Sequence, residues 1–139
     1  MSSGIETAEI SRWLYERLTG DPTLVSLVAG RVTYGDYPEE WENPLVQFIL
    51  VSSRDILGVG SQRIMVDSIW QIKVIDEGST YSRPLPIAKQ IDALLHGASE
   101  TTAFGHFESV RERGLQYPDV TAGVRSVHLG GMYRVRAST

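Results

Sequence analysis

The 139-residue sequence contains no cysteine. It therefore has no disulfide framework, no thiolate metal ligand and no cysteine nucleophile. Basic residues are also in the minority, because 13 Lys and Arg stand against 17 Asp and Glu, which gives a net charge of −4 and a pI near 5.3. Proteins that hold nucleic acid by its phosphates normally carry a basic excess, so the charge balance disfavours a dedicated nucleic-acid binder.

Long apolar runs are missing as well. The most apolar segment covers residues 45–51 and is interrupted by Gln47, whereas a bilayer-spanning helix needs about 20 apolar residues. The first ten residues, MSSGIETAEI, contain neither the basic segment nor the apolar core of a signal peptide. We therefore expect no membrane association, and a protein that works inside the cell or within an assembly. Length and a hydrophobic content of 42% predict one packed domain over residues 1–139.

Helical spacing of apolar residues marks two main helices and a short one between them. The short helix begins at Asp21-Pro22, where Asp21 is suited to cap the helix and Pro22 to occupy its first turn. Pro84 and Pro86 likewise fit only a first helical turn. The apolar stripes of the two main helices consist of Ile10, Trp13, Leu14 and Leu18 in the first and Ile87, Ile91, Leu94 and Leu95 in the second.

Five strands are predicted, at residues 31–34, 45–52, 63–76, 104–115 and 124–136. The third alternates most clearly, and the residues expected to face the helices are Ile64, Val66, Trp70, Ile72 and Val74. Gly130-Gly131 in the last strand suggests a bulge. The order α-α-β-β-β-α-β-β is not the regular alternation of a doubly wound fold. It predicts an α+β single domain, a mostly antiparallel (mixed) β-sheet with two main helices packed on one face.

Two segments between the predicted strands are candidates for contacts with other proteins. In the acidic loop 35–43, Tyr37 and Trp41 could anchor a protein interface or simply pack the loop. The second segment, 53–62, carries Ile56, Leu57 and Val59 beside Gly58 and Gly60 and has no evident core face to join. We expect a mobile loop there that becomes ordered against a partner, although a loop folded back on its own sheet is the alternative.

No residue pattern predicts catalysis. His96, His106 and His128 lie on separate predicted elements without the spacing of a metal motif, and they are expected at a helix end and at surface strand positions. Gly58-Val59-Gly60-Ser61 lacks the lysine and the following helix of a phosphate-binding loop. We therefore expect no catalytic residue, no cofactor and no metal. Carboxylates such as Asp55 and Asp67 leave open a small hydrolase or nuclease as a different class of function.

Taken together, the chain resembles the tail-terminator (tail-completion) proteins of long-tailed, non-contractile bacteriophages and prophages. The resemblance covers nearly the whole sequence and rests on the order of its elements and on several short motifs. These motifs are Asp21-Pro22 with Leu24, Leu27-Val28 and Gly30-Arg31-Val32, then Asn43-Pro44-Leu45-Val46, the helix with Ile87-Ala88, Ile91 and Leu94-Leu95, and Tyr133-Arg134-Val135 in the last strand.

The resemblance implies a structural protein of the virion, assembled in the host cytoplasm, with no catalytic motif. Such proteins form a hexameric ring on the last ring of the tail tube, stop its polymerisation and present a surface to the head-side connector. The implied partners are further copies of the chain, the major tail tube protein and the head-side connector or stopper protein, while DNA only passes through the lumen. The sequence is also compatible with a head-tail connector or stopper protein, and with a ligand-binding α+β domain of a cellular protein.

Overall fold

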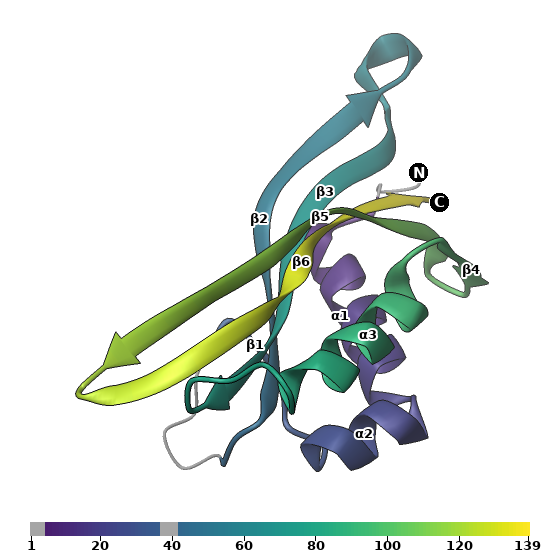
Figure 1. The fold of residues 1–139 in the computed structure, drawn as a ribbon. Helices are drawn as coiled ribbons and strands as arrows, with labels where there is room; N and C mark the ends of the chain where they lie inside the picture. Colours follow the sequence, from purple (N-terminus) through teal and green to yellow (C-terminus); the bar gives the residue numbers. More distant parts are fainter. Residues whose placement is uncertain (1–4, 37–41) are drawn as a thin grey trace.

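The computed structural model describes residues 5–36 and 42–139. These residues form one six-stranded sheet in the order β1-β2-β3-β6-β5-β4, with helices gathered on one of its faces (Figure 1). The helices are α1 (Thr7–Thr19), α2 (Pro22–Val28) and α3 (Pro84–Leu95), and a 3-10 helix, η1 (Val59–Ser61), joins β2 to β3. The strands are β1 (Val32–Tyr34), β2 (Leu45–Leu57), β3 (Arg63–Glu77), β4 (Ala98–Thr102), β5 (Gly105–Thr121) and β6 (Val124–Ser138).

The sheet is mixed, because β1 runs parallel to β2 whereas every other pair of neighbouring strands is antiparallel. The predicted α+β class is thus confirmed. The predicted order lacked β4, whose sequence ASETT is polar at four of five positions and gives no apolar alternation. In the part of the chain that the structure describes, no helix is long and apolar enough to cross a membrane.

The helical layer uses the stripes that the sequence predicts. Helix α1 buries Ile10, Leu14 and Leu18 together with Trp13, whose ring stacks on Phe107 of β5 at a centroid distance of 5.2 Å. The indole Nε1 of Trp13 donates to a carboxylate oxygen of Glu100 in β4 at 2.8 Å, which joins the first helix to the far edge of the sheet.

Helix α2 begins as predicted. The Asp21 carboxylate caps it by accepting a hydrogen bond from the backbone N–H of Leu24 at 2.9 Å, and Pro22 occupies the first turn. The same carboxylate oxygen accepts from Nε2 of Gln90 in α3, also at 2.9 Å. One side chain therefore starts a helix and holds it against another.

Strand β3 runs through the centre of the core. Four of the five side chains predicted to face the helices are buried, and Trp70 is only 1% exposed. Its indole Nε1 donates to the hydroxyl of Ser68, which in turn donates to the carbonyl of Val135 in β6, both at 2.8 Å. Ile64 was predicted wrongly, because its side chain is 51% exposed at an end of β3 that lies beyond the helical layer (Figure 1).

Strand β6 is hydrogen-bonded to β3 on one side and to β5 on the other. A Cβ atom at Gly130 would lie 2.1 Å from the carbonyl oxygen of Ile72 and 2.5 Å from Cα of Lys73. The bulge expected in this strand lies instead in β5, where the register shifts between Arg111 and Arg113. The glycines of β6 thus serve close approach of the backbones rather than an irregularity of their own strand.

The hairpin of β5 and β6 is longer than expected. Residues 117–123, which separate the predicted strands 104–115 and 124–136, are mostly strand, and the turn is formed by Ala122 and Gly123, with φ of 53° and 80°. Both faces of the ribbon are largely exposed from residue 118 to residue 125, so the sequence there lacks the apolar alternation that reveals a half-buried strand.

Replacing the central indole should destabilise the protein strongly. Trp70→Ala is expected to lower the free energy of unfolding by about 3–5 kcal/mol, because it removes a fully buried aromatic side chain and leaves a cavity. The matched control is Ile64→Ala, at the same face of β3 but half exposed, which should cost less than about 1 kcal/mol. Urea unfolding of both variants measures the difference, and equal losses would contradict the observed packing.

Adding one methyl group to β6 should also be poorly tolerated. Gly130→Ala must push apart the backbones of β3 and β6, because the atoms that its Cβ meets belong to the main chain. We expect a loss of about 2–3 kcal/mol or more, a severe case of overpacking. Gly123→Ala, in the open turn of the same hairpin, is the control and should cost about 1 kcal/mol for its positive φ alone. Thermal and urea unfolding measure the loss of stability. A Gly130→Ala variant as stable as the parent protein would refute the close approach of the β3 and β6 backbones.

Candidate interaction surfaces

Two β-ribbons project from the sheet beyond the helical layer (Figure 1). The β2–β3 arm comprises residues 51–65 and ends in η1, and the β5–β6 arm comprises residues 117–127 and ends in the turn at Ala122-Gly123. In Figure 1 the first extends upward and the second toward the lower left.

The β2–β3 arm replaces the mobile loop that we expected at residues 53–62. Strand β2 continues through Leu57 and stays paired with β3, with Arg54 opposite Asp67 and Ile56 opposite Met65. At the tip, the Gly58 amide donates to the carbonyl of Gln62 at 2.6 Å. The expectation of a loop was wrong because the exposed ribbon, like the other arm, shows no alternation of apolar and polar residues.

The tip of this arm is apolar and uncovered. The predicted contact residues Leu57 and Val59 are 55% and 99% exposed, and Ile56 is partly buried against the ribbon. Ile64, 51% exposed, adds to the same end of the arm. Exposed apolar side chains gathered at the end of a projection suit a contact with another protein. The other two predicted contact residues, Tyr37 and Trp41, lie outside the described residues.

The base of the arm carries an ionic cluster on the face away from the helices. The Asp67 carboxylate, 8% exposed, contacts Arg134 and lies 3.8 Å from Nε of Arg136 and 3.9 Å from Nη2 of Arg54. Nε of Arg134 also donates to Glu112 of β5 at 2.9 Å. Asp67 therefore connects three strands through cations.

This arrangement bears on the possibility of a carboxylate enzyme. Asp55 is opposite Val66 in the register, so it lies on the other face of the ribbon from Asp67, and its own partner is Arg63, 3.8 Å away. The two carboxylates named by the sequence are therefore not brought together. Among the described residues, no group of three or more His, Asp or Glu side chains is placed to hold a metal ion.

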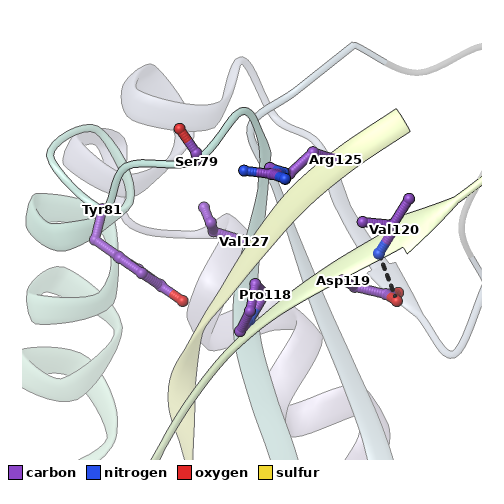
Figure 2. Close-up of a pocket in the computed structure, with 7 residues that line it drawn as sticks. All are labelled: Ser79, Tyr81, Pro118, Asp119, Val120, Arg125 and Val127. Atoms are coloured by element: carbon purple, nitrogen blue, oxygen red, sulfur yellow. Dashed lines mark hydrogen bonds between the residues drawn. The ribbon is translucent and has the colours of Figure 1, made fainter. Parts of the chain in front are cut away.

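A hollow of about 610 Å³ lies at the root of the β5–β6 arm (Figure 2). Tyr81 reaches into it from the turn before α3, toward Pro118 of β5, and Val127 forms part of its apolar wall. The charged groups at the site are Arg125 and Asp119, and the Asp119 carboxylate accepts the amide of Val120 at 2.9 Å. Apolar walls with a few charges at the edge suit the binding of a protein segment.

A second hollow, of about 620 Å³, lies against the opposite face of the same ribbon. Here the ring of Tyr117 stacks on His128 at 4.4 Å, and Nζ of the buried Lys73 donates to the Tyr117 hydroxyl. Burial and the nearby Lys73 ammonium lower the pKa of His128 to about 4, against the partial opposing effect of Asp119. His128 is thus neutral near pH 7 and only 7% exposed, not on the surface as we expected.

The other two histidines lie where the sequence places them. His96 ends α3, and its Nδ1 accepts the backbone N–H of Arg111 at 3.0 Å. His106 lies on β5, with Nδ1 2.7 Å from the hydroxyl of Thr101. The three imidazoles occupy three separate elements, as predicted.

Comparisons with known proteins place the fold. No family model matches the sequence, and no curated protein matches it. Among solved structures, a chain of the virion of a native gene transfer agent particle aligns with a TM-score of 0.64 and 20% identity over 91% of this chain and 92% of that chain. A second solved structure aligns with a TM-score of 0.59 and 14% identity over 95% of both chains. The protein therefore shares its fold, over about nine-tenths of both chains, with a chain of a gene transfer agent virion.

The buried imidazole should make stability depend on pH. The pKa of His128 is depressed in the folded state from 6.5 to about 4, so only the unfolded state is protonated between these values, and stability falls as the pH falls through this window. Between pH 7 and pH 4.5 the free energy of unfolding should fall in both proteins, but the fall should be about 2–3 kcal/mol smaller in His128→Gln than in the parent protein. Urea unfolding at both pH values measures this, with His106→Gln as the exposed control. Parallel pH profiles for all three proteins would contradict the assignment.

Proposed function

We propose that this chain is a structural protein of a phage-like particle that caps the tail tube as a ring. In this role it stops polymerisation of the tube and forms the joint to the head-side connector. The observation that carries the proposal is the fold, shared over nine-tenths of both chains with a component of a gene transfer agent virion. The resemblance of the sequence to tail-terminator proteins adds the position at the end of the tube.

The surfaces support a role in assembly. The two arms expose apolar side chains that contribute nothing to the core of the protein itself, among them Leu57 and Val59 on one arm and Val120 and Val124 on the other. Such side chains gain free energy only when a partner covers them. In the proposed ring, the partners are neighbouring copies, six in all, the tail tube protein and the connector.

The net charge suits a channel through which DNA passes. Each copy carries −4, so a ring of copies repels phosphate overall and does not retain DNA by counterion release. We propose that the protein acts by binding alone, without catalysis, which agrees with the separation of Asp55 from Asp67 and with the arginine partners of Asp67. Its place would be the neck of the virion, where DNA crosses the ring without being bound.

The test is polymerisation of the cognate tail tube protein with and without this chain. A terminator should shorten tubes as its concentration rises and appear as added density at one tube end in electron micrographs. A head-side stopper would leave tube lengths unchanged and bind isolated connectors instead. Tubes of unchanged length and bare ends, at saturating concentrations of the protein, would refute the proposed function.

The tip of the β2–β3 arm should matter for capping but not for folding. Val59→Asp places a charge on a side chain that is 99% exposed, so the free energy of unfolding should change by less than about 0.5 kcal/mol. Capping, measured as the concentration that halves mean tube length, should weaken by about ten-fold or more. The control is Leu85→Asp in the first turn of α3, 45% exposed, where the same change should have no effect on capping. Equal effects of the two variants would exclude the tip as a contact.

A further inference from the structure

One edge of the sheet is only partly covered. β1 pairs with β2 from Val46 to Phe48, and no strand of the described residues pairs with this side of β2 beyond that point. Among the strands of the described residues, residues 49–57 of β2 therefore pair with β3 alone. Strand edges of this kind readily pair with another chain unless lysine, proline or a covering element protects them. The sequence ILVSSRDIL contains neither lysine nor proline.

The opposite edge of the sheet is also covered over only part of its length. β4 pairs with β5 only from Gly105 to Ser109, and the Arg111 amide is satisfied by His96. From residue 112 to residue 121, no described strand pairs with the outer side of β5. Each edge of the sheet thus carries a short strand at one end and a bare stretch of similar length, nine or ten residues, at the other.

The two bare stretches are complementary in direction and in position. Because β2 and β3, β3 and β6, and β6 and β5 are antiparallel pairs, β2 and β5 run in opposite directions. The bare part of β2 is its C-terminal part, in the β2–β3 arm, and the bare part of β5 is also its C-terminal part, in the other arm. Two copies in the same orientation can be set side by side and displaced along the strands. The bare stretch of β5 in one copy then meets the bare stretch of β2 in the other as an antiparallel pair. β4 of the first copy lies at one end of this pair and β1 of the second copy at the other end.

We propose that the bare stretch of β2 in one copy pairs with the bare stretch of β5 in a second copy, so that one sheet continues from copy to copy. The contact joins two different surfaces of the chain, and repeated contacts of this type close into a ring when the rotation permits. Main-chain hydrogen bonds supply the affinity, as in strand addition generally. Only the closure of the paired copies into a ring rests on the proposed function; the pairing itself is argued from the edges of the sheet.

One residue shows which backbone groups of β5 face the second copy. Pro118 has no N–H, and in a strand a proline is tolerated where the N–H would point away from the neighbour, here β6. Backbone groups alternate in direction, so the N–H of Gln116 points to the bare edge as well. At Pro118 the bare edge therefore offers a second copy only a carbonyl group. At Gln116 it offers both an N–H and a carbonyl group.

The absence of cysteine permits a direct test. Ser53→Cys lies on the bare part of β2 and Gln116→Cys on that of β5, and three strand spacings, about 14 Å, separate these strands within one copy. A disulfide requires Cα atoms within about 7 Å. A bis-maleimide shorter than about 14 Å links cysteines of two copies in more than one register of the strand pair, but it is too short to link the two positions within one copy. Cross-links between these positions can therefore form only between copies.

Mixing the two single-cysteine proteins should give a heterodimer, and the double variant should give a ladder that ends in one closed species. The control pair, Thr19→Cys at the end of α1 with Gln116→Cys, should give at least ten-fold less product. Homodimers of the Ser53→Cys protein in equal yield, or no product at the highest soluble concentration and on capped tubes, would overturn the pairing. If the protein caps tubes but the 53–116 cross-link does not form, the pairing is refuted and the proposed function stands. If the cross-link forms but tubes are not capped, the proposed function is refuted and the pairing stands.

A second variant tests the backbone itself. Gln116→Pro removes the outward N–H that the pairing uses, whereas Gln116→Thr keeps it. Sedimentation should show the dissociation constant between copies raised by about ten-fold or more in the proline variant and unchanged in the threonine variant, while circular dichroism shows both folded. Association unaffected by Gln116→Pro would overturn the proposed edge contact.

Discussion

The four central strands of the sheet, β2, β3, β6 and β5, are longer than the helices that cover them, and most features of the surface follow from this mismatch. β3 has 15 residues and extends about 50 Å, whereas α3 has 12 residues and extends about 18 Å. A helical layer of this length can exclude water from only the middle of the sheet. There Trp70, Tyr133 and Phe48 are almost fully buried. The ends of the strands emerge as the two arms, and the exposed apolar residues Leu57, Val59, Val120 and Val124 lie on them.

The middle of the sheet depends on close contact along β6. Gly130 allows the backbone of this strand to approach β3. Gly131 is paired with Gly114, beside the register shift of β5, and a Cβ there would lie 2.8 Å from the carbonyl oxygen of Arg113. A bulge increases local twist, and the glycines remove the side chains that would resist it. The two arms diverge on either side of this region (Figure 1). Their directions are therefore set by the packing of main chains at the centre of the sheet.

The sequence predicted what side-chain periodicity can reveal. Both main helices, the cap at Asp21 and the buried side of β3 around Trp70 are confirmed, because burial on one face leaves a pattern of apolar residues. The arms and β4 were missed, since strands exposed on both faces carry no such pattern. Leu57 and Val59 were identified as contact candidates because they lacked a core face, and they are exposed as expected, but on a paired ribbon. The burial of His128 could not be foreseen, because it depends on a ring contact with Tyr117 across two strands.

The difference between a mobile loop and a preformed arm changes the energetics of assembly. A loop that orders on binding loses conformational entropy at that moment, which weakens association for a given buried area. A two-stranded ribbon alone is marginal in water, but the β2–β3 arm is anchored at its base, where Asp67 contacts Arg54 across the ribbon and Arg134 of β6. Its edge and apolar tip are therefore presented before a partner arrives. The net charge of −4 on each copy opposes association in free solution. Association of this kind is favoured where several contacts form together, as they would at the end of a tube that already holds neighbouring copies at high local concentration.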